Sequence, residues 1–297
     1  MKFTRPRLEG YHSKSHASFL AVLSLSLMSF PCGSREQAAV LPGRMPRPTH
    51  VLIVVEENKS YKQIIGNTAA PYINTLAKKG ALFTNSFAIA HPSQPNYLTL
   101  FSGSTHGVEE QCPLSLPGDN LASALKKKGL GFAIYSESLP SIGYTGCGYG
   151  HYSRKHNPVP NWGTDVSPDM NMPFSMLPSD YDKLPTVSMV IPNQLNDMHD
   201  GAPLAAIIRG DRWLRNNIAS YLTWAESHNS LLILTWDEDD DSSGNHIATI
   251  FVGPMVAAGR YGNRIDHLSV LRTLEDMYGL TLLGNTGQAQ PVRNIWK

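Results

Sequence analysis

The sequence lacks the short motifs that mark several large enzyme and binding-protein classes. It contains no Walker A loop, no dinucleotide fingerprint and no Cys/His spacing typical of a zinc site. It also contains no Gly-x-Ser-x-Gly elbow, which argues against a serine triad of the α/β-hydrolase type. A nucleotide-binding loop, a dinucleotide site and a structural zinc site are therefore not expected.

The chain also lacks an excess of charge of either sign. It has 25 Lys and Arg against 24 Asp and Glu, a formal net charge of +1 over 297 residues. Proteins that bind nucleic acid usually present a basic surface, so no nucleic-acid partner is expected. A phosphate-bearing ligand would have to be held by a local group of residues. The length and the 41% hydrophobic content allow one large domain, or at most two.

The N-terminal segment has the pattern of an export signal. Four cationic residues precede an apolar run at 17–30: Lys2, Arg5, Arg7 and Lys14. The run of about 14 residues is shorter than the roughly 20 that a spanning helix needs, although a membrane anchor is the alternative. No later stretch is apolar enough to span a bilayer. We expect a signal peptide at 1–39, a Pro/Gly linker at 40–48, a single domain at 49–297, and a secreted or periplasmic protein.

Cysteine is scarce, with three in the chain. Cys32 would leave with the signal, so Cys112 and Cys147 would remain as a pair. In an oxidising compartment such a pair suggests a disulfide. It would close a loop of about 35 residues and contribute about 3–4 kcal/mol in the chain-entropy model. The alternative is two unrelated buried thiols.

Apolar runs and amphipathic segments alternate along the domain. The expected strands are 50–55, 81–90, 131–136, 186–191, 229–235 and 247–252. The expected helices are 60–65, 69–79, a short one from Asn96 to Gly103, 119–128, 211–228 capped by Asp211, and 269–278. This alternation predicts an α/β fold with a mainly parallel sheet and helices on both faces. Residues 139–182 lack periodicity, and a loop of that length in a compact domain is usually functional.

Acidic residues follow two of the expected strands directly. Glu56-Glu57-Asn58 follows 50–55, and five carboxylates begin at Asp237-Glu238 after 229–235. Ligands of open α/β sheets bind at the carboxyl ends of strands. Crowded carboxylates repel and need a cation, and oxygen ligands favour Mg²⁺, Ca²⁺ or Mn²⁺. We expect Asp237 and Glu238 to bind a metal and 239–241 to face solvent; the alternative is that the whole run is a solvated loop.

A serine lies in the break after strand 81–90. The break is His91-Pro92-Ser93-Gln94-Pro95, and a helical pattern begins at Asn96. A hydroxyl there sits near the positive end of a helix, where a phosphate is favoured. Serine needs a base or a metal to become a nucleophile. We predict Ser93 as a nucleophile and Asn96 as a donor to a phosphoryl oxygen; the alternative for both is a helix-capping role.

Histidines near expected strand ends could bind phosphate or protonate a leaving alcohol. His199 lies in Asn196-Asp197-Met198-His199-Asp200-Gly201 after strand 186–191, and His267 precedes the last helix. The long loop adds Arg154-Lys155-His156. The alternatives are surface histidines and ordinary surface charge.

Several motifs together resemble the bacterial phosphoesterase family, which includes non-haemolytic phospholipases C and secreted acid phosphatases, those of mycobacterial type among them. Its Glu-Asn-x-Ser signature is similar to Glu57-Asn58-Lys59-Ser60. The other matching motifs are Asn196–Gly201, Gly210-Asp211-x-Trp213-Leu214, Thr235-Trp236-Asp237-Glu238, 269–275 and His91-Pro92-Ser93-x-Pro95-Asn96-Tyr97-Leu98. The likeness covers nearly all of 49–280.

The resemblance implies an alkaline-phosphatase-like, three-layer α/β/α sandwich. Ser93-x-Pro95-Asn96 is similar to the nucleophile turn of nucleotide pyrophosphatases in that superfamily. The metal ligands it implies are Glu57, Asn58, Ser93, Asp237 and Glu238, and the groups for phosphate contact or proton transfer are His156, His199 and His267. Glu238 departs from the pattern, because a metal-binding histidine often occupies its place.

The function that follows is a secreted phosphatase that hydrolyses phosphate monoesters through a metal-activated Ser93. Its substrate would be a small phosphate ester or a phospholipid headgroup, and its cofactor a divalent ion such as Mg²⁺, Ca²⁺ or Mn²⁺. One alternative is a phosphodiesterase of the phospholipase C type. A second, from another class, is an exported ion-binding or surface-interaction protein with a degenerate site.

Overall fold

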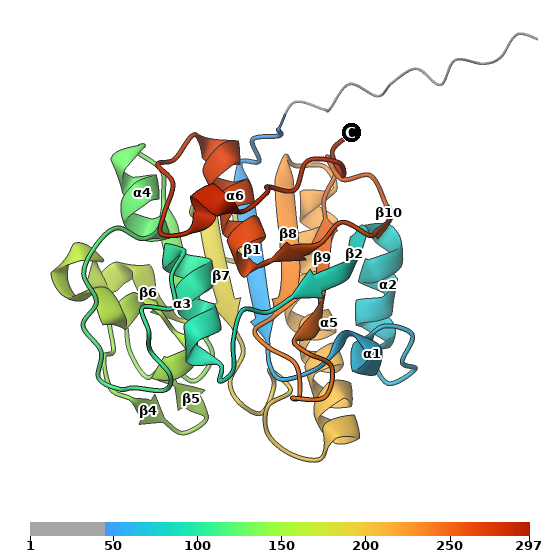
Figure 1. Cartoon of the computed structure of the whole chain (residues 1–297), viewed down its shortest axis with the longest axis horizontal. Coiled ribbons are helices and arrows are strands. Elements are labelled where there is room, and N and C mark those ends of the chain that lie inside the picture. Colours follow the sequence, from blue (N-terminus) through green and yellow to red (C-terminus); the bar gives the residue numbers. More distant parts are fainter. Residues whose placement is uncertain (1–44) are drawn as a thin grey trace, which may run out of the picture. The chain divides into compact units, whose positions relative to one another are not determined.

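A nine-stranded sheet forms the centre of the domain in the computed structural model, which describes residues 45–297 (Figure 1). The predicted signal peptide at 1–39 lies outside the described residues. The strand order is β10-β2-β9-β8-β1-β7-β3-β6, with β11 paired to β2. The strands of this sheet are β1 (His50–Glu56), β2 (Ala81–Phe87), β3 (Phe132–Ser136), β6 (Asn171–Pro173), β7 (Val187–Ile191), β8 (Ser230–Trp236), β9 (His246–Val252), β10 (Gly259–Tyr261) and β11 (Ile265–Asp266).

The sheet is mainly parallel, as the sequence predicts. β1 pairs in parallel with both β7 and β8, and β9 pairs antiparallel with both β8 and β2. The runs in β1, β7 and β8 are buried along their whole length, which explains why they read as continuous apolar stretches. Strand β1 therefore lies near the middle of the sheet, and its carboxyl end is surrounded by other segments.

Helices cover both faces of the sheet and complete three layers. The α-helices of the described residues are α1 (Tyr61–Ile64), α2 (Pro71–Lys79), α3 (Gln94–Ser102), α4 (Leu121–Lys127), α5 (Pro203–Ala225) and α6 (His267–Tyr278). Alternate residues of β1 point to opposite faces. Val51 and Ile53 pack in the core with α3, α4 and α6, whereas Leu52 and Val54 pack with α2 and α5. The predicted α/β/α sandwich is confirmed.

Helix α5 begins earlier than the sequence predicts, at Pro203 instead of after Asp211. Asp211 therefore caps a different helix. Its carboxylate accepts hydrogen bonds from the backbone N–H of Ile73 at 2.8 Å and of Tyr72 at 3.2 Å, both in the first turn of α2. The sequence identified Asp211 as a helix-capping residue, but the helix that it caps is α2 and not the helix expected at 211–228.

The long segment 139–182 is not structureless, contrary to our expectation. It holds the hairpin strands β4 (Gly148–Tyr149) and β5 (Tyr152–Ser153), the sheet strand β6, and the 3-10 helices η1 (Arg154–His156), η2 (Val159–Asp165), η3 (Pro168–Met170), η4 (Phe174–Met176) and η5 (Tyr181–Lys183). A last 3-10 helix, η6 (Thr286–Gln288), follows α6. These elements are too short to produce a periodic pattern.

One disulfide and one buried arginine fix the position of the segment 139–182. The predicted disulfide between Cys112 and Cys147 is present and ties it to the chain that follows α3. The guanidinium of Arg154 is buried and donates to Asn161 Oδ1 and to the carbonyls of Leu114 and Pro160. Arg154 is therefore a structural anchor of this segment and not a surface charge.

No helix within residues 45–297 combines the length and the apolar character needed to cross a bilayer.

Replacing Asp211 by Ala should destabilise the domain, because two N–H groups at the start of α2 would lose their acceptor. We expect a loss of about 1–2 kcal/mol in the free energy of unfolding, measured by denaturant titration. Asp211→Asn should retain most of the stability, since its side-chain oxygen can still accept. Equal losses in the Ala and Asn variants would contradict the capping role.

Candidate active site

Three segments that are far apart in sequence meet at the carboxyl edge of the sheet. Glu57 and Asn58 follow β1, Asp237 and Glu238 follow β8, and Ser93 lies after β2 at the start of α3. Glu56 is in register with Trp236, so the residues that follow the two strands emerge side by side. The convergence that the sequence predicts is observed.

The Ser93 hydroxyl points into this group of carboxylates. Its Oγ lies 3.0 Å from Glu238 Oε1 and 3.2 Å from Glu57 Oε2, and the residue is buried. Ser93 occupies the N-cap position of α3, yet its side chain makes no capping hydrogen bond to the helix. The capping alternative therefore fails for Ser93, and its hydroxyl is free to take part in chemistry.

Asn58 links the two acidic segments. It adopts a left-handed backbone conformation with φ of 45°. Its N–H donates to Asp237 Oδ1 at 3.1 Å, and its side-chain Nδ2 donates to Glu238 Oε1 at 2.8 Å. Asn58 Oδ1 and Asp237 Oδ2 are buried and have no hydrogen-bond partner among the described residues. Asn58 and Asp237 thus each keep one buried oxygen acceptor without a hydrogen-bond partner among the described residues.

The electrostatics of the group favour a bound cation. Burial raises the pKa of Glu57 well above its usual value, and Asp237 raises it further. Burial and the neighbouring Glu238 raise the pKa of Asp237 to about 8. Carboxyl groups with such raised pKa values stay protonated unless a bound cation replaces the proton. The buried acceptors of Asn58 and Asp237 and the oxygen-only donor set fit a hard divalent ion such as Mg²⁺, Ca²⁺ or Mn²⁺.

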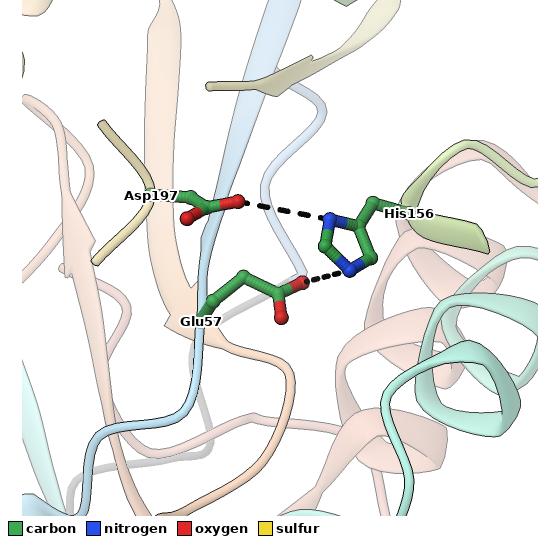
Figure 2. A group of neighbouring side chains, drawn as sticks. All are labelled: Glu57, His156 and Asp197. Atoms are coloured by element: carbon green, nitrogen blue, oxygen red, sulfur yellow. Dashed lines mark ion pairs between the residues drawn. The ribbon is translucent and has the colours of Figure 1, made fainter. Parts of the chain in front are cut away.

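A second group of potential ligands shares Glu57. Figure 2 shows Glu57, His156 and Asp197 pointing toward one another from three different segments. Their ligand atoms lie within 4.8 Å of one another, with His156 Nε2 3.3 Å from Glu57 Oε1 and His156 Nδ1 3.6 Å from Asp197 Oδ2. Burial lowers the pKa of His156 well below its usual value, which keeps the ring neutral and able to bind a metal.

Asp197 was not among our predicted site residues. Its position in the motif after β7 was a usable signal, because the other site carboxylates also follow strand ends. Its Oδ1 accepts from the backbone N–H of His199 at 2.8 Å, while its Oδ2 has no hydrogen-bond partner among the described residues. Burial raises the pKa of Asp197 well above its usual value.

The remaining predicted residues lie around this core. His199 is partly exposed, with Nδ1 2.9 Å from Asp200 Oδ1 and its ring 6.0 Å from that of His156. His267 is buried at the start of α6, and its Nε2 lies 2.9 Å from the Trp236 carbonyl. Asn96 uses its side chain on the turn before Ser93, accepting from Ile89 and Ala90 N–H and donating to Ala90 O. Their catalytic roles stay predictions.

The structure adds polar partners that the sequence did not single out. The Tyr97 hydroxyl donates to Glu57 Oε1, and the Tyr97 ring stacks on His156. The Lys59 ammonium is buried and donates to the carbonyls of Asn58 and Met198, each at 2.9 Å. These contacts hold the segments that carry the potential metal ligands together. Lys59 follows Asn58 directly in the sequence and is the cationic residue nearest to the acidic group along the chain.

Asp239 corrects our prediction that residues 239–241 face solvent. Its side chain is 1% exposed, and its carboxylate accepts from the N–H groups of Asp241, Ser243 and Asn245. Asp240 and Asp241 are exposed as predicted. Asp239 therefore shapes the loop after β8. His91, two residues before Ser93, contacts this loop, with Nδ1 2.9 Å from Glu238 Oε2 and Nε2 3.2 Å from Asp239 Oδ1.

Glu56 lies beside Glu57 in sequence but not in the same group. It ends β1, and strand alternation turns it to the face covered by α2 and α5. It is fully buried without a hydrogen-bond partner among the described residues, and burial raises its pKa well above the usual value. Burial of Glu56 thus favours its protonated form.

Comparison with solved structures agrees with the fold. A protein of the alkaline phosphatase superfamily from Vibrio parahaemolyticus aligns with a TM-score of 0.60, covering 84% of this chain and 71% of that one at 12% identity. A phosphonate monoester hydrolase from Silicibacter pomeroyi aligns with a TM-score of 0.57, covering 82% and 76% at 11% identity. At such identities the likeness concerns the fold. The fold is thus that of the alkaline phosphatase superfamily, with an acidic site and a serine at the carboxyl edge of its sheet.

The sequence comparisons identify the family to which the chain belongs. Residues 67–281 match the model of the Phosphoesterase family, and the chain belongs to that family. It is 46% identical to a phosphatidylinositol-3-phosphatase of Mycobacterium tuberculosis over 93% of this chain and 92% of the relative. It is 34% identical to a phosphate-repressible acid phosphatase of Penicillium chrysogenum over 71% of this chain, which spans about half (55%) of that relative. The protein is a hydrolase that acts on phosphoric ester bonds.

A divalent cation should stabilise the protein more at pH 8 than at pH 5. The raised pKa values of Glu57 and Asp237 mean that both carboxyls bind protons more strongly in the folded protein, and a metal must displace these protons to bind. We expect the increase in Tm on adding Mn²⁺ to grow as pH rises toward 8, as measured by scanning calorimetry.

Two variants control this measurement. Asp237→Asn should remove most of the Mn²⁺-dependent increase in Tm, whereas Asp119→Asn, at an exposed surface ion pair, should leave it unchanged. An increase of equal size at pH 5 and pH 8, or one that survives in Asp237→Asn, would contradict cation binding by this group.

Proposed function

We propose that the protein is a phosphomonoesterase whose nucleophile is Ser93. The observation that carries this proposal is the buried Ser93 hydroxyl, directed at Glu57 and Glu238 instead of at its own helix. Membership of the Phosphoesterase family supports it, as does the likeness to relatives named as phosphatases.

The proposed cofactor is a divalent metal ion, with Mg²⁺, Ca²⁺ or Mn²⁺ favoured. The residues that would hold it are Glu57, Asn58, Ser93, Asp237 and Glu238. When bound, such an ion neutralises charge on the transferring phosphoryl group and favours the ionised serine. Glu57, His156 and Asp197 form a neighbouring ligand group that shares Glu57 and could hold a metal ion.

In the proposed reaction, Ser93 Oγ attacks phosphorus in line as the bond to the leaving oxygen breaks. Glu57 Oε2 and Glu238 Oε1 are the acceptors within reach of the hydroxyl proton. A histidine supplies the proton to the leaving alcohol. His199 is better placed than His267 because it is partly exposed, where a leaving group can depart. Water then hydrolyses the phosphoserine. His156 would contact the phosphate.

The proposed substrates are small phosphate monoesters and phosphorylated lipid headgroups. The Mycobacterium tuberculosis relative is named a phosphatidylinositol-3-phosphatase, and the likeness covers 92% of its length. This supports a monoester on a lipid in preference to the diester that a phospholipase C would cleave.

We also propose that the protein is exported, with residues 1–39 as its signal peptide. The Cys112–Cys147 disulfide supports this, because disulfides persist mainly in oxidising compartments.

Ser93→Ala should abolish most of the activity while the fold survives. We expect turnover of an aryl phosphate to fall by about three orders of magnitude or more, since the variant lacks the attacking hydroxyl. The matched control is Ser102→Ala, which removes a buried hydroxyl at the other end of α3. Near-normal turnover in Ser93→Ala, with unchanged unfolding behaviour, would remove Ser93 as the nucleophile.

A monoester should be hydrolysed far faster than the corresponding diester. The core of the site is buried, and a diester would have to place a second ester group in it. We expect kcat/KM for an aryl phosphate to exceed that for a phosphocholine ester of the same aryl alcohol by about a hundredfold. A preference for the phosphocholine ester would instead assign the chain to the phospholipase C type.

A further inference from the structure

A loop after α3 contacts two segments of the candidate site. Residues 110–116, here called the bridge loop, belong to no helix or strand and are exposed or partly exposed to solvent. On one side the loop binds Gln94, the residue after Ser93. On the other side it binds the two residues that precede His156. The bridge loop therefore connects the segment of the proposed nucleophile to the segment that carries His156.

Gln94 makes the contact on the side of the nucleophile. It begins α3 directly after Ser93, and its side chain is buried. Its Nε2 donates to Gln111 O at 2.9 Å, and its Oε1 accepts from the Gln111 N–H at 2.7 Å. A side-chain amide carries both a donor and an acceptor, so it can pair with both backbone groups of one residue, which a carboxylate or an apolar side chain cannot do. The start of α3, and Ser93 with it, is thereby tied to the bridge loop.

The Cys112–Cys147 disulfide makes a contact on the other side. Cys112 follows Gln111 in the bridge loop, and Cys147 lies in the segment that leads to η1. The Cys147 carbonyl accepts from the backbone N–H of Arg154 at 3.0 Å, and Arg154 Nη2 donates to Leu114 O of the bridge loop, also at 3.0 Å. One covalent link and two hydrogen bonds thus join the loop to the start of η1.

Lys155 adds an ion pair next to His156. Its Nζ lies 2.7 Å from Glu110 Oε1 in the bridge loop, and its side chain is 22% exposed. His156 follows in η1, with its Nε2 3.3 Å from Glu57 Oε1 (Figure 2). Both residues that precede His156 are therefore held by the same loop that binds Gln94.

The two connected segments meet again at Glu57. Ser93 Oγ lies 3.2 Å from Glu57 Oε2, and His156 Nε2 lies 3.3 Å from Glu57 Oε1. Attack on a phosphate requires the nucleophile and the groups that contact the phosphate to keep fixed distances, and a misplacement of about 1 Å can cost about a hundredfold in rate. The bridge loop supplies a second connection between these segments, separate from the shared carboxylate.

We propose that the bridge loop sets the spacing between Ser93 and His156, with Gln94 as a positioning residue and the Cys112–Cys147 disulfide as the covalent part of the connection. This inference rests on the proposed function, in which Ser93 attacks phosphorus and His156 contacts the phosphate. Gln94 acts through its neighbour Ser93. Opening the bridge lets the nucleophile shift relative to the bound phosphate, which lowers the rate of the chemical step more than the affinity for substrate.

The test compares variants of the full protein in the hydrolysis of an aryl phosphate. Gln94→Met keeps the length of the side chain and removes both hydrogen bonds. Water can then bond to the backbone groups of Gln111, because that residue is exposed. Cys112→Ser with Cys147→Ser opens the covalent link, and a third protein combines all three changes. The matched control is Gln111→Ala, which removes a side chain but keeps the backbone groups that Gln94 contacts.

For each protein, kcat and KM are measured at a temperature at which denaturant titration shows it to be folded. A second measurement needs no substitution: tris(2-carboxyethyl)phosphine converts the disulfide of the folded wild type to two thiols, and kcat is measured before and after this treatment. The phosphine should have no effect on kcat of the Cys112/Cys147 variant.

We expect kcat of Gln94→Met to fall about tenfold while KM stays within about twofold of the wild type, because positioning is lost and binding is kept. The cysteine variant and the reduced wild type should each lose about threefold to tenfold in kcat. The combined variant should lose no more than about the larger of the single losses, since both changes open the same bridge and their effects are then not additive. Gln111→Ala should match the wild type.

Four outcomes would overturn the proposal. They are a wild-type kcat in folded Gln94→Met, a raised KM at unchanged kcat, a loss in Gln111→Ala equal to that in Gln94→Met, and losses in kcat that multiply in the combined variant. Failure of the proposed function is distinguishable, because it would appear as near-normal turnover in Ser93→Ala. Failure of the bridge alone would leave Ser93→Ala inactive and Gln94→Met fully active.

Discussion

The crowding of four buried carboxylates at one edge of the sheet is the constraint on which the site depends. Glu57, Asp197, Asp237 and Glu238 come from the ends of β1, β7 and β8 and are all buried. Like charges in a poorly solvated space cannot all ionise, so protons or a cation must accompany them. The apolar strands beneath hold the backbone in place, and the acids cannot relax apart. A serine hydroxyl placed among them is accordingly in a position where a cation and a phosphate are both favoured.

A set of contacts outside this group keeps the loop after β7 in position. Glu137 accepts hydrogen bonds from Asn193 N–H, from the Asn196 amide and from Trp213 Nε1. Met198 has an unusual φ of 80°, and its side chain lies where a Cβ on Gly210 would come within 2.6 Å of it. The absence of a side chain at Gly210 thus lets the loop pack against α5. The motif around Gly210 and Asp211 serves the site indirectly, by fixing the elements that carry Asp197 and His199.

The site is buried at its inner end, here called the floor, and partly exposed at its outer end, here called the mouth. At the floor, Ser93, Glu57 and His156 are buried, and Tyr97 contacts both Glu57 and His156. At the mouth, His199 is partly exposed and lies beside the carboxylate of Asp200. This gradient suits a substrate whose phosphate must leave water completely while the rest of it stays outside. A lipid headgroup and a small soluble ester both meet that requirement.

The sequence by itself determined the α/β class, the mainly parallel sheet, the Cys112–Cys147 pair and the convergence of Glu57, Asn58, Ser93, Asp237 and Glu238. Strand periodicity is local, and parallel strands deliver their carboxyl ends to one edge, so these features follow from pattern alone. Tertiary structure decided which partner each polar group meets. Asp211 caps a helix 138 residues away, Asp239 turns inward to organise its own loop, and Asn96 holds the turn before Ser93. Only packing brought Asp197 and His156 to Glu57, because hydrogen bonds between distant segments depend on where the whole sheet places them, and no short stretch of sequence encodes that placement.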